Sequence, residues 1–249
     1  VSDATRLKQG RGKGDRENYL PFLRIRDFSS LGRPHRPKGQ KIKRHFELFS
    51  DLEYYVFCHL DFADDVYDIK EQFNLNLDET IRIARQLNIK HPPEKSDEKF
   101  IMTSDFLVIK NDGSKVVLSV KPISELKKKR VIQKLQIEFE YWKIQGVQWH
   151  LITENELNAI VLRNLREFRE AYVLKLNHID KFLIRLRKID WKQNVKINEV
   201  IKRLSVDIKI TYANGRSIFL QLLAKKIIRF DYTKAFSTEM PLHNFILTD

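Results

Sequence analysis

Three ionisable residues in the middle of the chain, Glu53, Asp105 and Lys121, are of the types that hydrolyse phosphodiester bonds. Carboxylate oxygens are ligands that Mg²⁺ prefers, so Glu53 and Asp105 are candidate metal ligands. A lysine beside such a metal can orient or deprotonate the attacking water, and it can stabilise the pentacovalent charge. The three residues therefore predict a magnesium-dependent hydrolytic site, provided that the fold brings them together.

A predicted hairpin controls whether Asp105 and Lys121 meet. Residues 104–110 and 115–121 read as strands, and Asn111-Asp112-Gly113 between them is a strong turn signal. Because the start of the first strand then lies beside the end of the second, the acidic and basic side chains are predicted neighbours.

The length of the turn decides on which face Lys121 lies. A two-residue turn at Asp112-Gly113 would pair Asp105 with Val120 and would put Lys121 on the opposite face. A three-residue loop instead puts Asp105 opposite Ser119, with Lys121 diagonal to it on the same face. We predict the three-residue loop, or an equivalent bulge.

Two further groups are candidates for the same site. The backbone carbonyl of Val120 can supply another oxygen to the metal. Glu138 lies on the apolar stripe of a helix predicted from Ser124 to about Gln145. A carboxylate on a buried face needs a partner, and Lys121 or a metal-bound water would serve.

Each candidate also has an ordinary structural explanation. Glu53 is the third residue after Ser50, where a capping box places a glutamate for stability alone. Lys121 at a strand end can be a solvated charge that protects the sheet edge. Asp105 can be a cap or turn residue, and Glu138 can be a buried, hydrogen-bonded glutamate. The sequence leaves these explanations open.

Charge distribution indicates a polyanionic partner. The net charge is +13. Residues 1–50 hold 13 Lys and Arg against 5 Asp and Glu, residues 51–170 hold 18 against 21, and residues 171–249 hold 15 against 7. Basic surfaces bind nucleic acid by releasing its counterions, and the acidic centre suits carboxylates kept for a divalent metal. We therefore predict that the chain binds DNA.

Eight basic side chains are candidate contacts to DNA phosphates. The run Lys127-Lys128-Lys129-Arg130 falls early in a predicted helix, where the helix dipole disfavours cations, although such a run is often only a solvated face. The other four lie in two basic segments with little periodicity, 6–16 and 29–44, and are Arg11, Lys13, Arg33 and Arg36.

The order of predicted elements indicates an α/β chain in three parts. Residues 1–45 read as a basic N-terminal arm with loops, of which residues 6–16 form a flexible basic arm. Residues 46–170 combine helices, a hairpin, a crossover helix and a further strand, and their Glu, Asp and Lys outline a restriction-endonuclease-like domain with a mixed sheet flanked by helices. Residues 171–249 read as a small winged-helix-like domain of helices with a closing β-hairpin.

Several classes of protein are excluded. Cys58 is the single cysteine, so internal disulfides and thiolate metal clusters are ruled out. The longest apolar runs are far shorter than the roughly 20 residues of a membrane helix, and no Gly-rich phosphate loop is present. We expect a cytoplasmic, nucleoid-associated prokaryotic protein with no membrane partner.

Seven blocks between residues 6 and 155 carry a specific resemblance. They are Arg6-Leu7-Lys8-Gln9-Gly10-Arg11-Gly12, Tyr19-Leu20-Pro21-Phe22-Leu23, Ser50-Asp51-Leu52-Glu53, Asp68-Ile69-Lys70-Glu71-Gln72-Phe73, Ile89-Lys90-His91-Pro92, Thr103-Ser104-Asp105-Phe106-Leu107 and Val120-Lys121-Pro122. In this order they resemble the TnsA endonuclease family, whose members nick the 5′ strand at transposon ends. The resemblance of residues 171–249 is looser.

The resemblance implies Mg²⁺-dependent cutting coupled to a TnsB-like DDE transposase, with a TnsC-like AAA+ ATPase bound to the C-terminal domain. It implies that Glu53 and Asp105 bind metal, that Lys121 is the catalytic lysine and that Glu138 is a functionally important glutamate. Ser119 stands where the family has glutamine, and its shorter side chain predicts contact with the metal through water.

Two other functions remain compatible with the residues. One is a non-catalytic subunit that bridges DNA and protein partners through the basic ends and the winged helix. The other is a stand-alone restriction or junction-resolving nuclease of the same fold.

Overall fold

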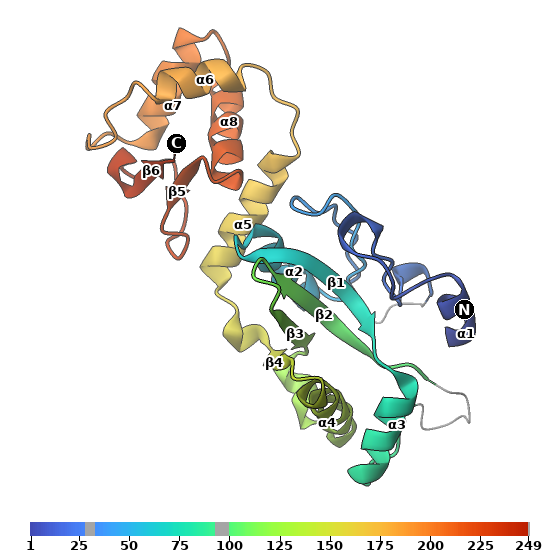
Figure 1. Ribbon diagram of the computed structural model, residues 1–249. Coiled ribbons are helices and arrows are strands. Elements are labelled where there is room, and N and C mark those ends of the chain that lie inside the picture. The colour runs from blue at the N-terminus through green and yellow to red at the C-terminus, as the bar shows by residue number, and fades with distance from the viewer. Residues whose placement is uncertain (28–32, 93–99, 249) are drawn as a thin grey trace. The chain divides into compact units, whose positions relative to one another are not determined.

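The computed structural model describes residues 1–27, 33–92 and 100–248, and the chain divides into two compact units, Val1–Leu157 and Asn158–Asp249 (Figure 1). The first unit contains α1 (Asp3–Lys8), η1 (Arg16–Asn18), η2 (Ile25–Asp27), α2 (Asp51–Phe62), β1 (Val66–Asn74), α3 (Leu77–Gln86), β2 (Thr103–Lys110), β3 (Lys115–Val120), η3 (Ile123–Lys127), α4 (Lys129–Ile144), β4 (Gln148–Ile152) and η4 (Glu154–Glu156). The second unit contains α5 (Ala159–Tyr172), α6 (Ile179–Leu186), α7 (Ile197–Asp207), α8 (Tyr212–Ala224), β5 (Ile228–Phe230), η5 (Leu242–Asn244) and β6 (Phe245–Leu247).

A mixed four-stranded sheet forms the centre of the first unit. Its strands lie in the order β1-β2-β3-β4, with the first two pairings antiparallel and the last parallel. A parallel pair cannot be joined by a tight turn, and α4 provides the crossover between β3 and β4. The predicted α/β class, with a mixed sheet flanked by helices, is confirmed.

Helices cover both faces of this sheet because its strands alternate apolar side chains between the two faces. On one face α2 packs against the strands through Val56, Phe57, Ile69, Phe106, Val108 and Val120. On the other face α3 and α4 pack through Ile83, Ala84, Leu107, Val117, Ile137, Tyr141 and Trp142. Polar side chains occupy the strand ends that lie between these two apolar layers.

The β2–β3 hairpin has the predicted three-residue loop. The Lys110 amide donates to the Ser114 carbonyl at 2.8 Å, and Gly113 has a φ of 83°. Ile109 pairs with Lys115 and Phe106 with Leu118, which is the register that a three-residue loop sets. Glycine is suited to the last loop position because its left-handed backbone is strained for other residues.

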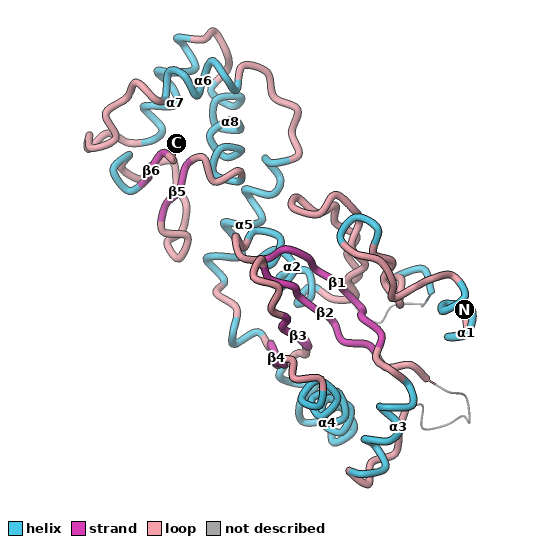
Figure 2. Tube along the Cα trace, viewed as in Figure 1, coloured by secondary structure: helices cyan, strands magenta, loops and turns pink. Residues whose placement is uncertain are grey.

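The N-terminal segment, residues 1–45, is packed against the sheet, so the prediction of a flexible arm within it is wrong. Figure 2 shows that most of this segment is loop, but Tyr19 and Phe22 are buried. Tyr19 donates from its hydroxyl to the Glu71 carbonyl at 3.1 Å, and the Phe22 amide donates to the Gln72 carbonyl at 3.3 Å. The segment therefore packs along β1 as part of the first unit, although residues 29–32 of the predicted basic loop lie outside the described residues.

A buried ion pair holds this segment in place. Arg44 donates to both carboxylate oxygens of Glu71, at 2.8 and 2.6 Å, and also to the Ile69 carbonyl at 2.6 Å. The Glu47 amide donates to Glu71 at 3.1 Å. Because neither charge reaches bulk water, each depends on the other for compensation.

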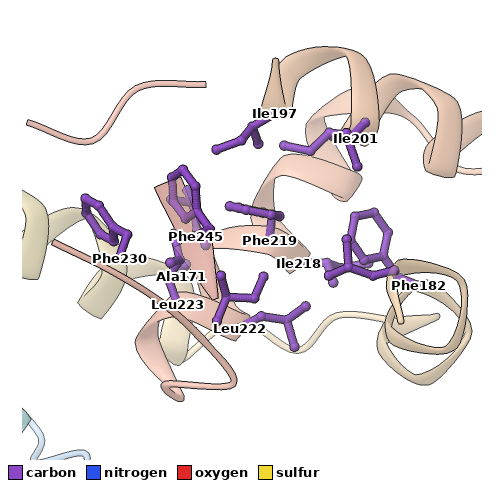
Figure 3. Packing of buried hydrophobic residues seen from close by; sticks show 14 of the residues in the cluster. Ala171, Phe182, Ile197, Ile201, Ile218, Phe219, Leu222, Leu223, Phe230 and Phe245 are labelled. Carbon is purple, nitrogen blue, oxygen red and sulfur yellow. The ribbon is translucent and has the colours of Figure 1, made fainter. Parts of the chain in front are cut away.

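The second unit forms a separate apolar core around α8. Phe182, Ile201, Phe219 and Phe245 converge from four different elements (Figure 3). A Cβ on Gly215 would come within 2.1 Å of the Ser205 hydroxyl, so glycine allows α7 and α8 to approach closely. Helix α5 belongs to this unit, whereas the sequence placed residues up to 170 with the sheet domain. Strands β5 and β6 of this unit pair antiparallel.

No helix in the described part of the chain combines the length and apolar character needed to cross a membrane.

Replacing Glu71 by Ala should lower the free energy of unfolding of the first unit by about 3–5 kcal/mol, because Arg44 would remain as an uncompensated buried charge. The matched control is Arg82→Ala, which removes a solvent-exposed ion pair with Glu79 on α3 and should cost no more than about 1 kcal/mol. Denaturant unfolding combined with hydrogen exchange measures both. Equal, small losses would show that the Arg44–Glu71 pair does not hold the segment.

Candidate active site

Asp105 lies at the centre of a cluster of ionisable side chains at the ends of β2 and β3. It is 9% exposed. Its Oδ2 accepts the Val120 amide at 2.6 Å and the Lys121 ammonium at 2.8 Å. The same ammonium donates to the Val120 carbonyl at 2.8 Å. The three-residue loop produces this arrangement, since a slip by one residue would move Lys121 to the other face.

Glu53 enters the cluster from the first turn of α2. Ser50 caps this helix by accepting the Glu53 amide at 3.1 Å. The Glu53 carboxylate in turn accepts from the Phe49 amide at 3.0 Å, the Ser50 hydroxyl at 3.1 Å and the Gln72 side-chain amide at 3.3 Å. Glu53 is therefore a helix-capping residue that is also buried close enough to Asp105 for their charges to interact.

Glu138 enters from the buried face of α4. Its Oε1 accepts hydrogen bonds from the hydroxyls of Ser104 and Ser119. Ser104 itself accepts the indole N–H of Trp142 at 2.8 Å, and Ser119 accepts that of Trp149 at 3.0 Å. Two Trp–Ser pairs thus converge on one carboxylate oxygen and fix its position.

The electrostatics of the cluster favour protonation of two of its carboxyls. Burial, followed by repulsion from the Asp105 charge, raises the pKa of Glu53 to about 7 and that of Glu138 to about 7. Burial opposes the charged form of Lys121, but attraction to Asp105 outweighs it, so the pKa of Lys121 lies above its ordinary value. Lys121 therefore stays a cation at neutral pH, with 35% of its side chain exposed.

The available ligand atoms suit a hard divalent cation that keeps part of its hydration shell. Among the described residues, no three His, Cys, Asp or Glu side chains are grouped closely enough to hold a metal ion by themselves. Glu53, Asp105 and the Val120 carbonyl offer only oxygen atoms. A hard ion such as Mg²⁺ takes few protein carboxylates and fills its remaining positions with water and substrate phosphate, so these groups fit it.

The predicted DNA-contacting residues have different surroundings. Lys127, Lys128 and Lys129 are exposed at the start of α4, and Lys128 pairs with Glu125 at 2.7 Å. Arg130 is only half-exposed and donates to Gln133. In the N-terminal segment the exposed candidates are Lys13, Arg33 and Arg36, the last of which donates to Glu47.

The surroundings of Arg11 contradict the prediction that it contacts DNA. It is 2% exposed, forms an ion pair with Asp27, and donates to the Phe22 carbonyl at 3.2 Å and to Gln9 at 2.9 Å. A guanidinium whose donors face buried protein acceptors is not available to a phosphate. Its role is to hold together the turns of the N-terminal segment.

Sequence reasoning missed four residues of the cluster: Gln72, Ser104, Trp142 as a hydrogen-bond donor, and Trp149. In the sequence, Trp142 indicated only the apolar stripe of the helix that carries Glu138. Ser104 lies in one of the seven blocks, directly before Asp105, but nothing indicated its role, because its partner Glu138 lies 34 residues further along the chain.

Comparison with known proteins identifies the family of the chain. Residues 63–154 match a family model described as the TnsA-like endonuclease N terminal. The chain is also 32% identical over 243 residues to the Escherichia coli protein named "Transposon Tn7 transposition protein TnsA", covering 95% of this chain and 88% of that relative. The chain belongs to the TnsA family. The resemblance drawn from the seven sequence blocks is confirmed, and so is the prediction of an endodeoxyribonuclease, which decides against a non-catalytic subunit.

The raised carboxyl pKa values predict how stability depends on pH. Between about pH 4.5 and 7, the folded protein keeps protons on Glu53 and Glu138 that the unfolded chain has lost, so stability falls as pH rises, by at most about 1.4 kcal/mol per pH unit for each group. Glu138→Gln keeps an acceptor for both serines and removes the titration. It should therefore flatten this slope in metal-free protein, as measured by denaturant unfolding at pH 5, 6, 7 and 8. A slope as steep as that of the wild type would contradict the assignment.

Proposed function

We propose that this TnsA-family endonuclease cuts the 5′ strand at transposon ends in a Mg²⁺-dependent reaction during cut-and-paste transposition. The observation that carries this proposal is the Asp105 carboxylate, which joins the Val120 amide and the Lys121 ammonium beside two buried glutamates. Family membership supplies the endonuclease class, and the name of the Escherichia coli relative supports transposition.

In this proposal Glu53, Asp105 and the Val120 carbonyl hold the metal. When bound, Mg²⁺ lowers the pKa of a water molecule and neutralises charge on the scissile phosphate. Because the Lys121 ammonium now contacts both Asp105 and the Val120 carbonyl, it must share these acceptors with a metal or move toward the phosphate. Its raised pKa favours charge stabilisation over proton abstraction as its role.

Glu138 and Ser119 act behind these groups. When Glu138 is ionised, its charge adds to that of Asp105 in raising the pKa of Lys121. The Ser119 hydroxyl donates to Glu138 and accepts from Trp149, and its residue is almost fully buried. We infer that Ser119 orients Glu138 and does not bind the metal directly.

DNA binding and partners complete the proposal. The exposed basic side chains Lys13, Arg33, Arg36 and Lys127–Lys129 contact DNA phosphates. A TnsB-like DDE transposase cuts the other strand, and the basic C-terminal unit, as a winged-helix-like domain, binds a TnsC-like AAA+ ATPase. The reaction takes place in the bacterial cytoplasm.

Asp105→Ala should reduce the rate of 5′-strand cleavage by at least about 100-fold, because it removes a metal ligand and the partner of Lys121. The assay is cleavage of transposon-end DNA by the full chain in Mg²⁺ with its purified partner transposase. Asp112→Ala, in the exposed loop of the same hairpin, is the matched control and should stay close to wild type. Full cleavage by Asp105→Ala would overturn the site. Efficient cleavage by the chain alone would instead favour a stand-alone nuclease.

Replacing Lys127 and Lys129 together by Ala should weaken DNA binding and reduce the slope of log K against log salt concentration by about 2, since each phosphate contact contributes about 0.9. Lys143→Ala is the control, because Lys143 is exposed near the other end of α4 and pairs with Glu140. Fluorescence anisotropy across a range of salt concentrations measures the slopes. If the double variant and the control have equal slopes, this end of α4 does not contact DNA.

A further inference from the structure

Gln72 has a strained backbone in the middle of a strand. Its φ is 50°, in the left-handed region that glycine favours, and its side chain is buried, with the residue 4% exposed. The described residues include five other non-glycine residues with positive φ, and all five lie outside the strands: Arg16, Asn88, His178, Lys209 and Lys226. Such strain persists only where the surroundings enforce it, and it is concentrated at functional sites.

The strained residue lies beside the centre of the candidate site. Glu71 pairs with Phe106 and Phe73 pairs with Ser104, so Gln72 stands opposite Asp105 in the antiparallel ladder. Both neighbours in this part of the strand are buried in contacts with charged groups, Glu71 with Arg44 and Gln72 with Glu53.

The Gln72 side chain makes two polar contacts that define its orientation. Its Nε2 donates to Glu53 Oε2 at 3.3 Å, and its Oε1 accepts the Thr103 hydroxyl at 3.3 Å. Its backbone carbonyl accepts the Phe22 amide at 3.3 Å, which links it to the N-terminal segment. The amide is therefore held on one side by a strand neighbour and aimed on the other side at Glu53.

This contact exceeds what the α2 cap requires. Within the cap itself, Glu53 Oε2 already accepts the Phe49 amide and Oε1 already accepts the Ser50 hydroxyl. The additional donor comes from a different element and lies next to Asp105 in the sheet. It joins the Glu53 carboxylate on α2 to the strand residue that stands opposite Asp105, so it can set where Glu53 lies relative to Asp105.

We propose that Gln72 is a positioning residue that sets the Glu53 carboxylate relative to Asp105 for binding a divalent cation. This inference rests on the proposed function of Glu53 and Asp105 as metal ligands. Partners that orient ligand side chains typically contribute 10- to 100-fold to metal affinity.

Gln72→Gly separates the side chain from the backbone strain, because glycine adopts the same φ without the amide. We expect the dissociation constant for Mn²⁺, measured by electron paramagnetic resonance on the full chain without DNA, to rise by about 10-fold or more. The Mg²⁺ concentration for half-maximal cleavage should rise in parallel, with near wild-type cleavage recovered at high Mg²⁺. Gln145→Ala, an exposed glutamine at the end of α4, is the control and should change neither quantity.

The outcomes distinguish this inference from the proposed function. Unchanged Mn²⁺ affinity in Gln72→Gly, together with lost affinity in Asp105→Ala, would overturn the role of Gln72 alone. Unchanged affinity in both variants would overturn the metal site itself. A lower melting temperature of Gln72→Gly without recovery of cleavage at high Mg²⁺ would show that Gln72 is only structural, and would also overturn the inference.

Discussion

The first unit depends on one constraint, the placement of several charges where little water reaches them. Glu53, Asp105 and Glu138 are three carboxyls that share one nearby ammonium, Lys121. In such surroundings like charges repel strongly, so two of the carboxyls resist ionisation near neutral pH. A divalent cation would relieve the same repulsion. In the proposed function, the repulsion that destabilises the folded protein would thus also favour the binding of a metal.

The remainder of the unit can be understood as support for this cluster. Apolar layers on both faces of the sheet leave the polar groups at the strand ends. The Trp142 and Trp149 indoles fix the serines that hold Glu138. On the other side the N-terminal segment, anchored by the buried pair between Arg44 and Glu71, runs along β1 beside Gln72.

Features that depend on residues close together in the chain were predictable from the sequence, and features that depend on distant residues were not. The hairpin register was predictable because it depends on a few adjacent residues, above all Gly113. The Ser50–Glu53 cap was predictable for the same reason. Arg11 was misjudged because its partner Asp27 lies in a separate turn, and charge alone does not distinguish a buried guanidinium from an exposed one. Gln72 lies in one of the seven blocks, but its role was not predictable, because its left-handed backbone does not follow the alternation of a strand.

By itself the sequence determined which chemistry is available: carboxylates and a lysine at spacings that suit phosphodiester hydrolysis, two basic ends, and blocks that resemble one endonuclease family. Only the tertiary structure decided which of these groups share a site, how far each is removed from water and which basic residues remain exposed. The physical reason is that residue type and local spacing act over a few residues. Burial, pKa and charge pairing instead depend on neighbours that the fold brings from distant parts of the chain.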